Sequence, residues 1–82
     1  MGKYYIIVKF IDIPNEFKDL LESIADKLAR NYKGSWIEGS VYTGAGCFRF
    51  QNRASRLAFI NNISEEVSKT GGVTSLESYE SK

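Results

Sequence analysis

The run from Tyr4 to Ile13 constrains the fold most strongly. Its sequence, YYIIVKFIDI, is dominated by aromatic and β-branched residues, which favour strands. The run has too little polarity for an exposed edge, so it predicts a central strand. Pro14 and Asn15 are expected to end this strand and begin a helix, with the Asn15 side chain accepting from the free amides of the first turn.

The segment 15–33 has the spacing of an amphipathic helix. Apolar residues recur every three or four positions, so they share one stripe that is expected to be buried. Acidic residues lead and basic residues trail, which matches the helix dipole. Gly34 is expected to end the helix in the left-handed conformation. The apolar stripe consists of Phe17, Leu20, Leu21, Ile24 and Leu28.

The second half of the chain predicts a hairpin, a helix and a last strand. Segments 35–42 and 46–51 have strand composition, and a turn through Thr43, Gly44 and Ala45 joins them. Gly39 indicates a bulge or a close backbone approach. Asn52 is the expected cap of the second helix, which Gly71-Gly72 ends. The stripe expected to be buried in this helix is Leu57, Ile60, Ile63 and Val67, with Phe59 as an additional candidate.

The tail of the chain, VTSLESYES (73–81), alternates weakly between apolar and polar residues. It is expected to be a strand at a sheet edge, where serine and glutamate discourage pairing. The complete order of elements is then strand, helix, strand, strand, helix, strand. This order predicts a single domain over residues 1–82 with a ferredoxin-like α+β sandwich, in which two helices cover one face of a four-stranded antiparallel sheet.

The uncovered face of the predicted sheet is the expected place of function, together with the edge strands, because this fold has no deep internal cleft. Side chains alternate between the two faces of a strand. The residues predicted to face the helices are Ile6, Val8, Phe10, Phe48 and Phe50. Those predicted on the open face are Tyr5, Ile7, Lys9, Cys47 and Arg49. The remaining tyrosines, Tyr4, Tyr32 and Tyr79, are expected at the rim of the core.

The segment 43–50, TGAGCFRF, resembles the eight-residue signature of the RNA-recognition motif. The element order resembles that family over nearly the whole chain, which implies a single-strand binder with Tyr5 as its first-strand aromatic. Ala45 and Cys47 replace the two aromatic residues on which the family stacks bases, so two stacking platforms are missing. Thr43 and Phe48 also depart from the signature. The matching positions are Gly44, Gly46 and Phe50.

The composition excludes most catalytic chemistry. The chain has no histidine, which removes the usual general base and the commonest transition-metal ligand, and its one cysteine, Cys47, lacks an imidazole partner. We therefore expect no enzymatic activity, no cofactor and no metal. The lone cysteine, the absence of a leader and the short apolar runs favour a cytoplasmic protein with no membrane partner. The net charge of +1 means that any binding has to be local.

The candidate binding residues come from the open face, the arginine run and the second strand. Arg53 and Arg56 are interpreted as solvated surface or as a patch for phosphate or an acidic partner. Trp36 is interpreted as part of the core or, with Tyr42, as a docking edge. The complete set is Tyr5, Ile7, Lys9, Trp36, Tyr42, Arg49, Arg53 and Arg56.

The sequence favours a non-catalytic regulator or inhibitor that binds another protein, of the antitoxin-like or phage anti-defence kind. One alternative is an RNA-recognition-like module for single-stranded nucleic acid. A second is a metabolite-binding regulatory dimer. A homodimer is a further expectation, because a chain of 82 residues buries only about 60% of its unfolded surface or slightly more.

Overall fold

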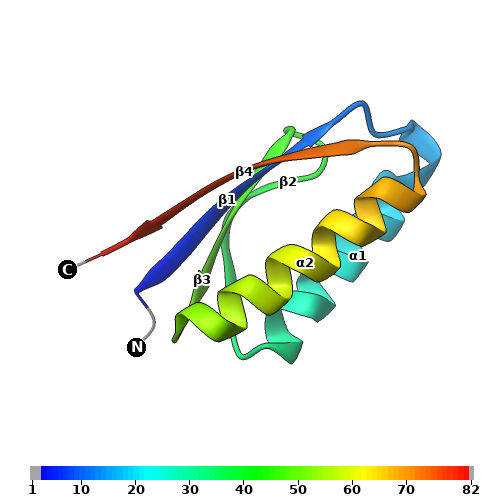
Figure 1. The fold of residues 1–82 in the computed structure, drawn as a ribbon. Coiled ribbons are helices and arrows are strands. Elements are labelled where there is room, and N and C mark those ends of the chain that lie inside the picture. The colour runs from blue at the N-terminus through cyan, green and yellow to red at the C-terminus, as the bar shows by residue number, and fades with distance from the viewer. Residues whose placement is uncertain (1–2, 82) are drawn as a thin grey trace.

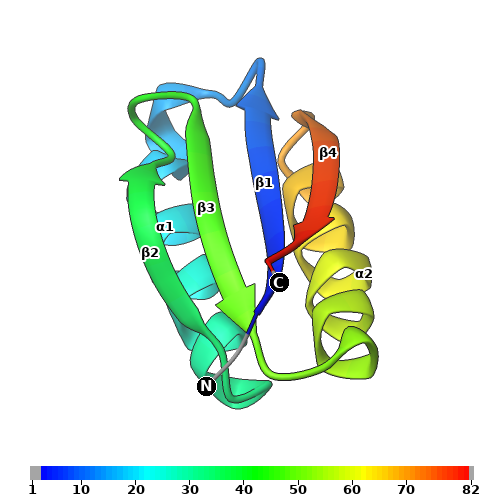
Figure 2. The same ribbon diagram turned by 90° about the vertical axis from the view of Figure 1, so that its left-hand side faces the viewer.

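In the computed structural model, residues 3–81 form a four-stranded antiparallel sheet with two helices on one face (Figure 1). Figure 2 shows both helices behind the sheet, with the other face uncovered. The strand order is β2-β3-β1-β4, so β1 is central, and the expected ferredoxin-like α+β fold is confirmed. The elements are β1 Tyr4–Ile11, α1 Asn15–Asn31, β2 Ser35–Ser40, β3 Ala45–Phe50, α2 Arg53–Lys69 and β4 Val73–Glu80.

The core lies between the sheet and the two helices. Strand alternation places the inner residues of β1 and β3 as predicted, and all five of them are buried. Phe59 of α2 packs between the two phenylalanines of β3, with ring centroids 4.6 Å from Phe48 and 5.0 Å from Phe50. The core residues supplied by the sheet are Ile6, Val8, Phe10, Phe48 and Phe50.

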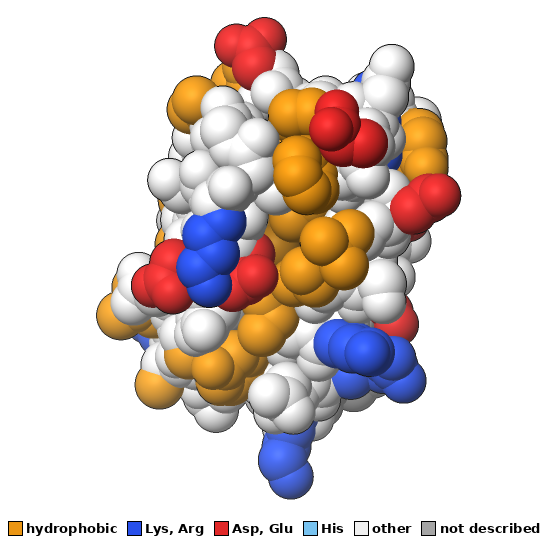
Figure 3. Space-filling view, turned by 90° about the vertical axis from the view of Figure 1, so that its right-hand side faces the viewer, with side chains coloured by type: hydrophobic (Ala, Val, Ile, Leu, Met, Phe, Trp, Pro, Cys, Tyr) orange, Lys and Arg blue, Asp and Glu red, His pale blue; other side chains and the backbone are white. Residues whose placement is uncertain are grey.

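The buried face of α1 differs from the predicted stripe. Leu21, Ala25 and Ala29 are fully buried, whereas Leu20 is 51% exposed. Alanine side chains are small, so this face of α1 can pack closely within the core, while the bulkier apolar residues lie at the margin of the core. Phe17, Ile24 and Leu28 are half-buried there. Figure 3 shows the result as a band of apolar surface on the helical side of the molecule.

The buried face of α2 also differs from the prediction at one position. Ile63 and Val67 are buried as expected, and Phe59 belongs to the core. Leu57 is 58% exposed, so the prediction of its burial is wrong. The position on the buried face is taken by Arg56, whose contacts with the sheet are described below. Ile60 is half-buried and packs against the edge of the core.

The ends of the helices follow local chemistry that the sequence indicated only in part. Asn52 caps α2, because its side-chain oxygen accepts from the Ser55 amide at 2.8 Å. Asn15 does not cap α1, since it already lies inside the helix and Pro14 occupies the capping position without a side-chain bond. Lys33, not Gly34, adopts the left-handed conformation after α1, with a φ of 60°.

Gly34 is needed for a different reason. Its amide donates to the Ala29 carbonyl at 2.7 Å and completes the end of α1. An added Cβ would lie 2.4 Å from the Phe50 ring, so only glycine fits beside this core residue. The prediction that α1 ends at Gly34 is therefore correct, but the predicted left-handed conformation of this residue is wrong.

The hairpin between β2 and β3 is irregular, as Gly39 indicated. The pairing register shifts between Trp36 and Glu38, which is a bulge. Gly39 has a φ of 87°, and a Cβ there would lie 2.1 Å from the Ala45 carbonyl oxygen, so both of the predicted features are present. β2 ends at Ser40, two residues earlier than expected, because the turn begins there. No helix within residues 3–81 is long and apolar enough to span a membrane.

Candidate interaction surface

The open face is the side of the sheet opposite the helices, and it carries the predicted residues of β1 and β3. Cross-strand pairs place Tyr5 beside Arg49 and Ile7 beside Cys47. The register of β4 adds Tyr79 opposite Tyr5 and Glu77 opposite Ile7. Because directly paired residues point to the same side, these side chains share one surface. We define the open face as Tyr5, Ile7, Lys9, Cys47, Arg49, Glu77 and Tyr79.

Two stacked tyrosines are the most distinctive feature of the open face. The rings of Tyr5 and Tyr79 are parallel within 3°, and their centroids are 4.9 Å apart. Tyr79 is 42% exposed, so the expectation that it lies at the core rim is wrong. The register of β4 decides this placement, because pairing with Tyr5 turns Tyr79 away from the helices. A sequence that alternates as weakly as β4 does not reveal its register.

Cys47 of β3 contacts one member of this aromatic pair. Its sulfur is 3.6 Å from the Tyr79 hydroxyl, and the residue is half-buried. The hydrogen bond with Cys47, together with burial, raises the pKa of the Tyr79 phenol above its usual value. The thiol and the phenol therefore act as packing groups that hold the stacked pair against β3.

The charges on and around the open face have both signs. Lys9 and Arg49 contribute positive charge, and Glu77 contributes negative charge. Glu38 of β2 pairs with Cys47 and so lies on the same side of the sheet. The surface therefore combines a stacked aromatic pair with charges of both signs, and it lacks the continuous basic patch that is typical of nucleic-acid-binding surfaces.

The arginine run does not form one surface patch. Arg56 is only 9% exposed, so the interpretation as solvated surface is wrong for this residue. One guanidinium nitrogen of Arg56 donates to the backbone carbonyls of Tyr5 and Tyr79, each at 3.2 Å, and to the Glu80 carboxylate at 3.0 Å. Arg56 thus supports the strands beneath the tyrosine pair from the helical side.

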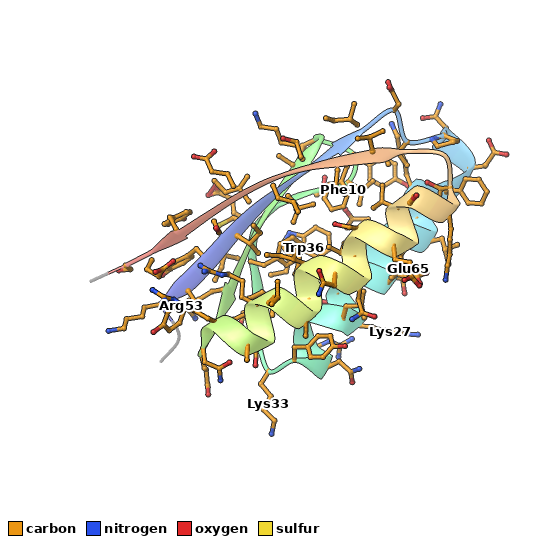
Figure 4. All side chains as sticks on the ribbon, viewed as in Figure 1. Phe10, Lys27, Lys33, Trp36, Arg53 and Glu65 are labelled. Atoms are coloured by element: carbon orange, nitrogen blue, oxygen red, sulfur yellow. The ribbon has the colours of Figure 1, made fainter. Side chains whose placement is uncertain are left out.

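Arg53 is exposed and is held at the same end of the sheet. It donates to the other Glu80 oxygen at 2.9 Å, and Figure 4 shows it beside the beginning of β1. Only Arg49 of the three arginines lies on the open face. The structure therefore separates Arg49 from Arg53 and Arg56, which face the helical side and share one acidic partner.

The stability that Glu80 contributes through its ion pairs with Arg53 and Arg56 depends on pH. Hydrogen bonds from Arg53 and Arg56 hold the pKa of Glu80 below its usual value. A depressed folded-state pKa means that Glu80 stabilises the fold above its unfolded pKa, about 4.3, and loses this effect as pH falls through its folded value. We expect the melting temperature of the wild type to exceed that of Glu80→Gln near neutral pH, and the difference to shrink on acidification.

Thermal melts from about pH 6 to about pH 3 measure this effect. Glu77→Gln is the matched control, because Glu77 lies on the same strand and no ion pair joins it to the described residues. As the pH falls, the melting-temperature difference between the wild type and Glu80→Gln should narrow by more than the difference between the wild type and Glu77→Gln. A gap between wild type and Glu80→Gln that does not change with pH would contradict the assignment.

Trp36 and Tyr42 lie away from the open face. Trp36 is half-buried, packs against Phe48 with ring centroids 4.7 Å apart, and donates from its indole nitrogen to the Glu38 carbonyl at 3.0 Å. The core interpretation of Trp36 is confirmed. Tyr42 is exposed in the turn after β2, where its hydroxyl bonds to Asp19 and the Lys18 nitrogen lies 5.9 Å from its ring centroid. The two aromatics do not form a common docking edge.

A shallow hollow lies on the helical side of the molecule. Its volume is about 420 Å³, and it is lined by Lys27, Leu28, Arg30 and Asn31 of α1. Figure 4 labels Lys27, which points outward from this side. Across residues 3–81, no three His, Cys, Asp or Glu side chains are arranged to hold a metal ion. The hollow contains none of the predicted site residues.

Comparison with known proteins adds no assignment. No protein-family profile matches this chain, and no curated protein matches it significantly. The resemblance to the RNA-recognition motif therefore stays a prediction. Function has to be inferred from the chemistry of the surface.

Proposed function

We propose that this chain is a non-catalytic protein that binds another protein through the open face. The observation that carries the proposal is the stacked pair of half-buried Tyr5 and exposed Tyr79 within a set of charges of both signs. Tyrosine and arginine are among the residues most enriched at the positions that dominate binding energy in protein interfaces. We assign it a regulatory or inhibitory role, of the antitoxin-like or anti-defence class, because such a role needs only binding to a partner and no catalytic group.

The preorganisation of the tyrosine pair supports this role. The two rings stack on each other, and the hydrogen bond between Cys47 and the Tyr79 hydroxyl restrains one end of the pair. Arg56 fixes the backbone carbonyls of both tyrosines from the other side of the sheet. Side chains that are already ordered lose little conformational entropy when a partner binds, so more of the contact energy appears as affinity.

The same geometry is less suited to reading bases. Bases stack on exposed ring faces, and each tyrosine has one of its faces covered by the other. Ala45 and Cys47 stand where the RNA-recognition motif supplies aromatics, and Arg53 and Arg56 are bonded to Glu80. Lys9 and Arg49 remain on the open face as cations, but Glu38 and Glu77 oppose them.

A charge reversal on the open face tests the proposal. The tagged chain is used to capture partners from a native lysate treated with nuclease, with Arg49→Glu and Lys27→Glu as a matched pair of variants. We expect wild type and Lys27→Glu to retain the same protein and Arg49→Glu to lose it. With the purified partner, Tyr5→Ala should weaken binding by about thirtyfold or more, the effect of removing a central interface residue.

Circular dichroism melts show that the variants are folded before binding is measured. Equal binding by Arg49→Glu, Tyr5→Ala and the wild type would overturn the proposal. Fluorescence anisotropy with RNA and DNA oligonucleotides tests the nucleic-acid alternative. Binding that requires Arg49 and weakens steeply with salt would replace protein recognition by phosphate-driven recognition.

A further inference from the structure

β4 is a long sheet edge without the usual protection. In the described part of the chain its only strand neighbour is β1, and the register is continuous from Tyr4–Glu80 to Ile11–Val73. All of its residues except Thr74 are exposed. Natural edge strands are normally protected by bulges, prolines or lysines, none of which occurs in β4, whereas the opposite edge, β2, contains a bulge.

The charges of β4 give little protection against pairing. Serine and glutamate in this segment predicted an edge that discourages pairing. The structure engages Glu80 with Arg53 and Arg56, so its charge is compensated at one end of the strand. Glu77 is left as the single unpaired charge within β4. One central charge restricts the register of pairing but does not prevent it.

The free backbone groups of β4 can be identified from its pairing with β1. The amide of Ser81 donates to the Lys3 carbonyl at 2.8 Å, so odd-numbered residues bond toward β1. Residues of an antiparallel strand alternate in the direction of their backbone groups. Thr74, Leu76, Ser78 and Glu80 therefore direct their amide and carbonyl groups outward, away from the sheet. This row is complementary to itself when a second copy is turned by a twofold rotation.

We propose that β4 pairs antiparallel with β4 of a second copy of this chain, with Leu76 of one copy opposite Leu76 of the other. In this register Leu76 pairs with Leu76 and Thr74 with Ser78, and each pair exchanges both backbone hydrogen bonds. Val73 of one copy faces Tyr79 of the other on the open face, a pairing of β-branched and aromatic residues that stabilises sheets. Ser75 faces Glu77, so no like charges stand directly opposite each other.

Neighbouring registers are less favourable. Centring the pair on Glu77 places two carboxylates directly opposite each other, and like charges at such positions are destabilising. Centring it on Ser75 places Val73 of each copy opposite Glu77 of the other. Only the register centred on Leu76 pairs apolar residues with apolar residues and separates the two glutamates.

Two exposed leucines on the helical side of β4, Leu76 and Leu57, support the same assembly. Leu76 pairs with the buried residue Val8, so it points to the helical side, yet it is 41% exposed. On α2, Arg53 bonds to Glu80 and Ser64 bonds to Thr74. Leu57 lies four residues after Arg53 and seven before Ser64, and therefore on the same flank of the helix beside β4. A second copy at this edge would cover both leucines.

The dimer would join the two open faces into one continuous surface. Each Tyr79 would then stand between Tyr5 of its own chain and Val73 of the other. This inference does not depend on the proposed function, since it concerns the edge of the sheet and the partner is the chain itself. Arg49→Glu should change partner capture without changing the mass of the purified chain.

Light scattering on the purified chain measures the assembly. We expect twice the chain mass for the wild type and a single-chain mass for Ser78→Pro, because proline removes an outward amide that is not bonded to β1. Ser78→Ala is the matched control and should stay dimeric. Circular dichroism shows that each variant is folded. A single-chain mass for the wild type over about a hundredfold range of concentration would overturn the proposal.

A cross-linking experiment tests the register. In a Cys47→Ser background, Leu76→Cys places two thiols at the twofold axis, where the expected Cα separation of about 5.5 Å suits a disulfide. Mild oxidation should give a covalent dimer with Leu76→Cys and almost none with Glu77→Cys. Cross-linking of Glu77→Cys but not of Leu76→Cys would overturn the proposed register, and no cross-link in either variant would overturn the pairing itself.

Discussion

Phe59→Ala is expected to lower the free energy of unfolding by about 3–5 kcal/mol, the range for removing a fully buried phenylalanine. Phe59 has no exposed surface and packs against both Phe48 and Phe50. Through this side chain α2 packs against the second half of β3. A domain of this length has a total stability of about 4–12 kcal/mol, so the substitution should remove at least about a quarter of that stability and, at the lower end of the range, all of it.

Urea denaturation followed by circular dichroism measures this loss. Leu20→Ala is the matched control, because Leu20 belongs to the predicted buried stripe of α1 but is half-exposed in the structure. We expect this control to change the stability by less than about 1 kcal/mol. Similar losses for the two variants would show that the apolar band on the helical side is as well covered as the core, contrary to the structure.

The orientation of the strands could be predicted well, because side chains alternate between the two faces of a sheet. Each strand therefore has only two possible orientations, and in β1 the apolar residues Ile6, Val8 and Phe10 select one of them. The five predicted members of the open face on β1 and β3 follow from that choice. The sequence also identified β1 as central, since a strand buried on one face and paired on both edges has little room for polar residues.

The helices were harder to orient, because an apolar stripe can be wider than the contact that buries it. In α1 the spacing of large residues points to Leu20, whereas the fully buried residues are Leu21, Ala25 and Ala29. Small residues such as alanine contribute little to a hydrophobic pattern, but they allow a helix to approach its neighbours most closely. In α2 the buried position of Arg56 could not be recognised, because its acceptors are backbone carbonyls of β1 and β4.

The candidate site was predicted on two of its three strands. Tyr79 was missed because its placement depends on the register between β4 and β1, which join the two ends of the chain. Stacking of Tyr5 and Tyr79 and the support of their carbonyls by Arg56 are likewise long-range contacts. Local patterns determine which face a residue occupies within its strand, while the neighbours on that face come from the topology.

Gly39→Ala is expected to lower the free energy of unfolding by about 2 kcal/mol more than Gly44→Ala. Both glycines have a left-handed φ, 87° and 90° respectively, so both substitutions carry a backbone strain of about 1–2 kcal/mol. The two positions differ in how much room there is for an added Cβ. A Cβ on Gly39 would lie 2.1 Å from the Ala45 carbonyl oxygen, while a Cβ on Gly44 meets no atom within 4 Å.

The overlap at Gly39 involves the backbone on both sides, which no rotamer change can relieve. The hairpin therefore has to shift, and a shift of packed structure costs about 1–3 kcal/mol. Urea titrations of the two variants give the difference in stability, and amide chemical shifts of β2 and β3 locate the movement. Because Glu38 adjoins Gly39 and pairs with Cys47, the movement should reach the open face beneath Tyr79. Equal losses in the two variants, with unchanged β3 shifts, would show that strain alone determines both effects.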